Sequence, residues 1–153
     1  MKIEFPEELM LGYEELDSQH VCIHKAFTEM LDAMSSGKSH TKFFSLIKFL
    51  EDYATEHFAM EEDLMESHNY PKIREHREEH WKFAARFSEQ KERFEKEGVT
   101  SSLVIKTQNW LFEWLTDHIK RVDREFIEFV KPRIENGENL PAEKQVLRAK
   151  DAD

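Results

Sequence analysis

Apolar side chains recur at three- and four-residue steps along four long stretches of the chain, and short polar breaks separate these stretches. This spacing is typical of amphipathic helices that each have one apolar face. The four predicted helices run from residue 17 or 18 to residues 35–37, from residues 40–41 to residues 68–71, from residue 71 to residues 97–98, and from residue 101 or 102 to residue 132. Short connections between four such helices predict an all-α fold, an antiparallel up-down-up-down four-helix bundle.

The ends of these helices follow from residues that cap or interrupt a helical backbone. Asp17 or Ser18 is expected to cap the first helix, and Pro71 stops the second because proline cannot continue a helix. A bend or break is expected near Asp123 in the fourth helix. We assign residues 1–134 to the bundle and residues 135–153 to a polar C-terminal tail with room for one short helix.

The composition agrees with a helical fold and excludes several others. The chain has 153 residues, the size of one ordinary domain, and only four glycines and four prolines for the turns that a many-stranded β protein needs. Cys22 is the only cysteine, which rules out a disulfide framework and a cysteine-based zinc site.

The chain is strongly acidic. Its net charge of −10, from 22 basic and 32 acidic residues, repels nucleic-acid phosphates and anionic lipid surfaces. The N-terminus lacks the apolar run of a signal peptide, and no stretch approaches the length of a membrane-spanning helix. We therefore expect a cytoplasmic protein with neither a nucleic-acid partner nor a membrane partner.

Side chains that can bind a metal ion interrupt the apolar stripe of every predicted helix. In chain order they are His20, His57 with Glu61, His76 with His80, and His118. A lone histidine in such a stripe is usually a core residue satisfied by one hydrogen bond. These positions, however, lie early in the first and third helices and late in the second and fourth, which is the same end of an antiparallel bundle. Burying them unpaired at one level would cost several kcal/mol, and coordination to a metal removes that cost.

The spacing within two of the helices suits shared coordination. Residues four apart lie about 40° apart around a helix and about 6 Å apart along it. His57 with Glu61, and His76 with His80, can therefore each present two ligands to one centre. Glu62 lies about 100° further round its helix and is expected to face elsewhere.

The fourth helix poses a separate question, because Asp123 follows His118 by five residues. A regular α-helix would turn the two side chains about 140° apart. Either the helix unwinds or bulges between them, or Asp123 is not a ligand.

The remaining histidines and the cysteine receive simpler interpretations. His24 follows His20 by four residues and is an alternative ligand, although one ligand per level of the first helix favours His20. His40 and His68 are expected to be solvated at helix ends. Cys22 neighbours the first ligand in sequence but points to another face of the helix.

Several segments resemble the signature of the hemerythrin family. They are residues 57–65 with the sequence HFAMEEDLM, residues 76–80 with the sequence HREEH after a Tyr-Pro pair, residues 114–123 with the sequence WLTDHIKRVD, and residues 17–20 with the sequence DSQH. The resemblance covers roughly residues 9–131, and all seven ligand positions of the family are occupied. The chain departs from the family in having Phe5 where many members have tryptophan, and in a longer C-terminal tail.

The resemblance implies a non-haem centre of two iron ions joined by an oxo or hydroxo bridge. It implies that one iron is bound by His76, His80 and His118 and the other by His20 and His57, with Glu61 and Asp123 bridging both. The second iron would then keep a vacant position for dioxygen. Five apolar residues are placed to line that position, while also being ordinary core residues: Ile23, Phe27, Trp114, Leu115 and Ile119.

The function implied by the resemblance is reversible dioxygen binding for storage, delivery or sensing, without enzymatic turnover. Oxygen-activating bundle proteins use Glu-x-x-His pairs, and the sequence contains none. Two alternatives remain open at this point. One is a di-iron oxidase, peroxidase or nitric-oxide-handling enzyme with the same ligands, and the other is an iron store or sensor. Iron rather than manganese or zinc rests on the resemblance alone, because sites of histidine and carboxylate accept several divalent metals.

Overall fold

The computed structural model describes residues 4–35 and 40–137 of the chain. A short 3-10 helix, η1 (Glu7–Leu9), precedes α1 (Glu14–Ser35), α2 (His40–Ser67) and α3 (Ile73–Glu97). The last long helix consists of three consecutive parts, α4 (Ser101–Asp117), the π-helix η2 (His118–Asp123) and α5 (Arg124–Glu135). The described residues contain no strand, so the predicted all-α fold is confirmed.

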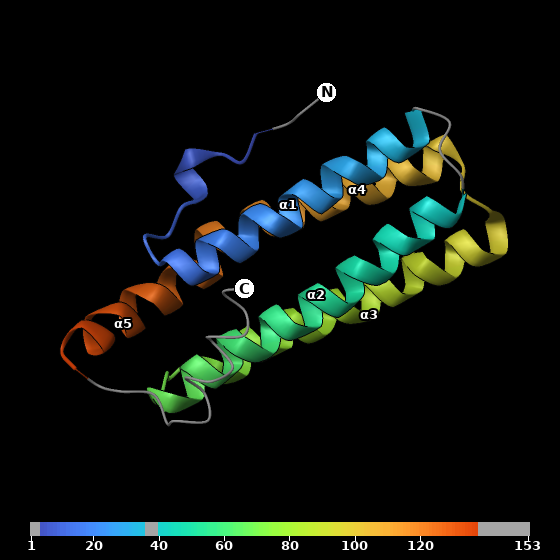
Figure 1. The fold of residues 1–153 in the computed structure, drawn as a ribbon. Helices are drawn as coiled ribbons and strands as arrows, with labels where there is room; N and C mark the ends of the chain where they lie inside the picture. The colour runs from blue at the N-terminus through green and yellow to red at the C-terminus, as the bar shows by residue number, and fades with distance from the viewer. Residues whose placement is uncertain (1–3, 36–39, 138–153) are drawn as a thin grey trace.

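The helices α1, α2, α3 and the continuous helix α4–η2–α5 make up four long helical segments. They lie side by side and alternate in direction (Figure 1). Helix α1 packs against α2 and α4, and α2 packs against α3. Aromatic rings close the remaining side of the bundle, where Phe83 of α3 stacks on Trp110 of α4 with ring centroids 5.3 Å apart. The four-helix bundle predicted from the hydrophobic pattern is therefore the observed one. No helix in the described ranges is long and apolar enough to cross a membrane.

The expected cap of the first helix is wrong, because α1 begins at Glu14, three residues before Asp17. The Asp17 carboxylate instead accepts hydrogen bonds from the backbone N–H groups of Leu11 at 2.7 Å and Gly12 at 3.0 Å. Gly12 has φ +76°, a backbone conformation that residues with a Cβ rarely adopt. Asp17 thus holds the segment before the helix rather than the helix end itself.

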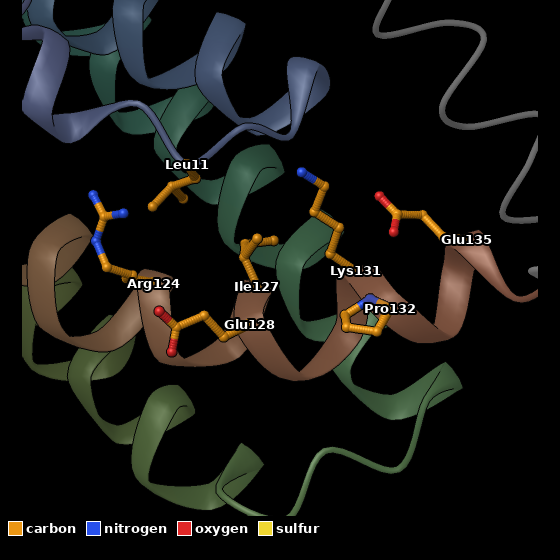
Figure 2. Close-up of a pocket in the computed structure, with 7 residues that line it drawn as sticks. All are labelled: Leu11, Arg124, Ile127, Glu128, Lys131, Pro132 and Glu135. Atoms are coloured by element: carbon orange, nitrogen blue, oxygen red, sulfur yellow. The ribbon is translucent and has the colours of Figure 1, made fainter.

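A surface groove of about 390 Å³ lies between this N-terminal segment and α5 (Figure 2). Leu11 faces Ile127 across it, and Arg124 donates a hydrogen bond to the backbone oxygen of Glu8 at 2.8 Å. Two cationic and two anionic side chains line the groove together with apolar ones: Leu11, Arg124, Ile127, Glu128, Lys131, Pro132 and Glu135. The N-terminal segment is therefore hydrogen-bonded to α1 through Asp17 and to α5 through Arg124.

The other helix ends lie close to their predicted positions. Thr100 caps α4 by accepting a hydrogen bond from the backbone N–H of Leu103 at 3.2 Å. Helix α3 begins at Ile73, two residues after Pro71. Pro132, expected to end the last helix, lies inside α5, which continues to Glu135. Residues 138–153 lie outside the described residues, so the proposed division into a bundle of residues 1–134 and a tail stays a prediction.

The buried apolar residues form two clusters rather than one. The smaller cluster contains Leu16, Leu64, Met65, Tyr70, Phe126, Ile127 and Val130. The larger one fills the other end of the bundle and includes Phe27, Leu50, Phe83, Phe94 and Leu111. Along each long helix, the metal-competent residues lie between residues of the larger cluster and residues that belong to the smaller cluster or pack against it. The exception is Ile119 of the larger cluster, which lies between His118 and Asp123. The candidate site is therefore a polar layer that divides the hydrophobic core.

Candidate metal centre

Seven side chains capable of binding a metal meet in this polar layer. Each is at most 3% exposed, although histidines and carboxylates are rarely buried so completely. They come from the four helical segments of the bundle and are His20, His57, Glu61, His76, His80, His118 and Asp123. The structure thus brings together all seven residues that the sequence singled out. Their role as metal ligands stays a prediction.

The seven residues divide into two overlapping groups in which the potential ligand atoms lie within 4.8 Å of one another. The first contains His76, His80 and His118, and the second contains His20 and His57. Glu61 and Asp123 belong to both groups. The geometry therefore suits two ions that share two carboxylates, with three imidazoles on one side and two on the other.

The Nε2 atoms of the imidazoles face the two carboxylates. Glu61 lies 2.9 Å from Nε2 of His57 and 3.0 Å from Nε2 of His80. Asp123 lies 3.1 Å from Nε2 of each of the other three imidazoles, those of His20, His76 and His118. The two carboxylates therefore stand at the centre of the cluster, with the imidazoles around them.

The π-helix η2 explains how Asp123 reaches this cluster. The backbone N–H of Arg124 donates to the oxygen of Ile119, five residues earlier, in place of the four-residue step of an α-helix. The wider turn places residues five apart on one face, and Oδ1 of Asp123 lies 3.1 Å from Nε2 of His118. Of the two possibilities left open by the sequence, the bulged helix is the observed one.

The buried polar atoms of the cluster fit a bound cation. Both oxygens of Glu61 and of Asp123, and Nε2 of four of the five imidazoles, have no hydrogen-bond partner in the described part of the chain. A buried polar atom without a partner costs roughly 1–3 kcal/mol, and more when it is charged. Nitrogen and oxygen donors of this kind bind iron, zinc and manganese, so coordination would satisfy all of these atoms at once.

The carboxylates also shift the protonation of the imidazoles. Burial lowers the pKa of His20, but the negative charges of Asp123 and Glu61 beside the ring outweigh it and raise that pKa to about 9. The pKa values of His76 and His118 rise to about 9 for the same reason. For His57 burial prevails, and its pKa is lowered. Although burial opposes it, the surrounding imidazoles hold the carboxyl pKa values of Glu61 and Asp123 well below their usual range.

Metal binding near neutral pH is therefore expected to release protons. Since three imidazole pKa values are raised above 6.5, protonation stabilises the metal-free protein fully below about pH 6.5, and this contribution disappears as the pH rises through about 9. A cation must displace these protons, so its apparent affinity is expected to increase between those pH values. Calorimetric titration with zinc in buffers of different ionisation enthalpy counts the protons. Zero released protons at pH 7 would contradict the expectation.

Polar side chains outside the two groups contact the outer nitrogens of the cluster. Glu62 accepts a hydrogen bond from Nδ1 of His80 at 2.9 Å, and Gln19 accepts one from Nδ1 of His57 at 2.5 Å. Glu62 was expected to face elsewhere, and it does lie outside both groups. Its rotation around α2 nevertheless directs it toward α3, where the outer side of His80 lies. Hydrophobic periodicity along one helix does not reveal such contacts, because they depend on how two helices pack.

A cavity of about 10 Å³, room for about one water-sized molecule, borders the cluster. Its lining includes Ile23, Phe27, Trp114 and Leu115, four of the five residues expected to line an oxygen pocket. Ile119 is fully buried and lies in the larger core cluster, but it is not among the residues that line the cavity. Of the imidazoles, His20, His57 and His118 reach the cavity.

The remaining histidines and Cys22 lie outside both groups. His24 packs between the rings of Phe5 and Phe112, with centroids 5.4 and 5.1 Å away. His40 is exposed, as expected. The expectation that His68 is solvated is wrong, because it is only 5% exposed. Asn69, with φ +53°, lies in the turn that follows α2.

A four-helix bundle with a buried layer of imidazoles around two shared carboxylates defines a class of cation-binding helical proteins. The sequence model of one such family, described as the hemerythrin HHE cation binding domain, matches residues 11–130. The chain belongs to the hemerythrin family.

Relatives in bacteria and in animals agree with this membership. A bacteriohemerythrin of Pseudomonas aeruginosa (strain LESB58) is 34% identical over 126 residues, covering 82% of this chain and 79% of its own. A bacteriohemerythrin of Stenotrophomonas maltophilia is 30% identical over 129 residues, covering 84% and 81%. A myohemerythrin of Theromyzon tessulatum is 27% identical over 120 residues, covering 78% and 87%. The range matched by the family model includes all seven residues of the candidate centre.

Proposed function

We propose that this protein reversibly binds dioxygen at a centre of two iron ions, for storage, delivery or sensing. The observation that carries the proposal is the unequal division of ligands around two shared carboxylates, next to a small apolar cavity. His20 and His57, the two imidazoles of the smaller group, both line this cavity. A cytoplasmic location is part of the proposal, and cell fractionation tests it.

In this proposal His76, His80 and His118 hold one iron, His20 and His57 hold the other, and Glu61 and Asp123 bridge both. When bound, two ferrous ions supply the electrons that dioxygen accepts. The two carboxylates offset part of the charge of the two cations, and the imidazoles remain neutral donors. The site has two carboxylates, whereas a carboxylate-rich di-iron bundle has four, so it supplies less negative charge and stabilises highly oxidised iron less, which favours reversible binding.

The cavity lining supports binding more than turnover. Apart from three imidazoles whose Nε2 atoms face the carboxylates, the described residues that line it carry no titratable side chain: Ile23, Phe27, Ala54, Phe58, Phe83, Trp114 and Leu115. An apolar cavity with no other titratable side chain offers a reduced oxygen species no further proton source from the protein, and it has room for only a very small ligand.

The decisive test adds air to the anaerobic protein loaded with ferrous iron and follows its visible absorption, with metal analysis on the same sample. The proposal expects two irons per chain and a coloured adduct that bleaches under vacuum over repeated cycles. Immediate irreversible oxidation with release of peroxide would overturn it and would favour an oxidase. Iron uptake without any oxygen adduct would favour an iron store or sensor.

Replacing Ile23 with threonine is expected to speed autoxidation of the ferrous protein in air. The substitution adds a hydroxyl group to the cavity wall, where it can hold water and donate a proton to reduced oxygen. The matched control is Ile47→Thr, which makes the same change in the buried core, at a position outside the cavity lining. Stopped-flow absorption measures both rates. Equal acceleration in the two variants would attribute the effect to lost stability rather than to the cavity.

A further inference from the structure

Two of the imidazoles in the candidate centre are hydrogen-bonded through Nδ1, the nitrogen that faces away from the two shared carboxylates. Their partners are side chains of different charge. His57 meets an amide, because its Nδ1 lies 2.5 Å from Oε1 of Gln19. His80 meets a carboxylate, because its Nδ1 lies 2.9 Å from Oε1 of Glu62. His57 belongs to the group with two imidazoles and His80 to the group with three. The outer contacts therefore differ between the two proposed ion positions.

The contacts of Gln19 determine which nitrogen of His57 carries a proton. The amide nitrogen of Gln19 donates to Sδ of Met60 at 3.2 Å, and a thioether sulfur can only accept. The amide oxygen of Gln19 is therefore the atom that faces His57, and Nδ1 of His57 must be the donor. The lone pair of Nε2 then points at Glu61, 2.9 Å away, and is free for a cation.

Glu62 has the same effect on His80, because a carboxylate can only accept from Nδ1. Nε2 of His80 is thereby left with its lone pair toward Glu61, 3.0 Å away. The second oxygen of Glu62 lies 3.5 Å from Nε of Arg77, so the carboxylate is held in place on both sides. A hydrogen bond to a carboxylate makes an imidazole a stronger donor to a metal than a hydrogen bond to a neutral amide does.

A second carboxylate lies on the same side of the centre. Oε2 of Glu79 is 3.9 Å from Nδ1 of His118, and Oε1 of Glu79 accepts a hydrogen bond from Arg121 at 3.2 Å. His118 also belongs to the group with three imidazoles. Carboxylates therefore stand behind two imidazoles of that group, whereas an amide stands behind one imidazole of the other.

We propose that Glu62 and Gln19 are positioning residues that make the two ion positions unequal. Through His80, Glu62 strengthens the position with three imidazoles, so this position binds its ion more tightly and holds the higher oxidation state more readily. Through His57, Gln19 fixes the ring without adding charge, so the position beside the cavity stays the weaker one. The inference rests on the two-ion centre of the proposed function, but not on dioxygen binding.

The test uses the full chain loaded with cobalt(II) and measures both binding steps in competition with a chelator, following the ligand-field absorption. Glu62→Gln keeps the shape of the side chain and removes its charge, and it is expected to weaken the tighter step by roughly 10–100-fold. Glu66→Gln is the matched control. Glu66 also lies on α2 and also pairs with Arg77, at 3.4 Å, but it is exposed and has no contact with His80.

A second variant tests the inference by an expected gain in metal affinity rather than a loss. Gln19→Glu places a carboxylate behind His57 and is expected to tighten the weaker step, which brings the two affinities closer together. Combined with Glu62→Gln, it is expected to bring the two affinities, and the potentials of two irons in a redox titration, closer together than either variant does alone. Circular dichroism establishes that each variant keeps its helical content.

Three results would overturn the inference. They are equal effects of Glu62→Gln and Glu66→Gln, an unchanged tighter step in Glu62→Gln, and an unchanged difference between the two affinities in the double variant. Failure of the ferrous protein to bind dioxygen reversibly would overturn the proposed function alone, because cobalt binding does not involve dioxygen.

Discussion

Replacing Glu61 with alanine is expected to reduce bound iron well below two per chain. Glu61 is fully buried, belongs to both ligand groups, and lies within 3.6 Å of Nε2 of four imidazoles. Its removal takes a donor from each proposed position and leaves the imidazoles crowded around Asp123 alone. Because the carboxylate also offsets charge, two divalent ions would repel each other more strongly at close range.

Iron analysis and visible absorption of the purified variant measure this effect. Glu66→Ala is the control, because it removes an exposed carboxylate from the same helix. The control is expected to retain two irons. Two undisturbed irons in the Glu61 variant would remove Glu61 as a bridge and would leave Asp123 as the single shared carboxylate.

Most of the fold could be predicted from the order of polar and apolar residues along the chain. The stripes of the four helices place Leu16 before His20, and Glu61 before Leu64, so that every helix passes from one core cluster through the polar layer to the other. The antiparallel order of the helices was sufficient to place these polar residues at one level of the bundle. Candidate ligands that share one face of a regular helix can therefore be predicted from their spacing in the sequence alone.

The features that sequence spacing did not reveal depend on contacts between elements or on a departure from regular helix. Asp17 looked like a helix cap because its type favours that role, but its carboxylate binds backbone N–H groups that precede it. The contact between Glu62 and His80 joins two helices, and it exists only because of their packing. For Asp123 spacing alone left two outcomes open, and the π-helix decides between them.

Removing a large core residue far from the centre is expected to separate stability from metal binding. Phe94 of α3 is 1% exposed and packs edge to face on Phe43, with ring centroids 4.8 Å apart. It follows His80 by 14 residues, or about 21 Å along the helix. Phe94→Ala is expected to cost about 3–5 kcal/mol, because it removes apolar contacts and leaves a cavity. At about 2–4 °C per kcal/mol, the Tm of the metal-free protein falls by roughly 6–20 °C.

The metal-loaded variant is expected to recover much of this loss. Metal binds the folded centre and stabilises it by about 4 kcal/mol when its free concentration is roughly 1,000 times Kd, which is similar to the cost of the cavity. Thermal melts with and without metal measure both quantities, and Glu95→Ala serves as an exposed neighbour on the same helix. Two irons in the folded variant show that the polar layer binds metal independently of the distant core. If the fully folded Phe94→Ala variant loses iron, packing about 21 Å along the helix from His80 determines the ligand geometry instead.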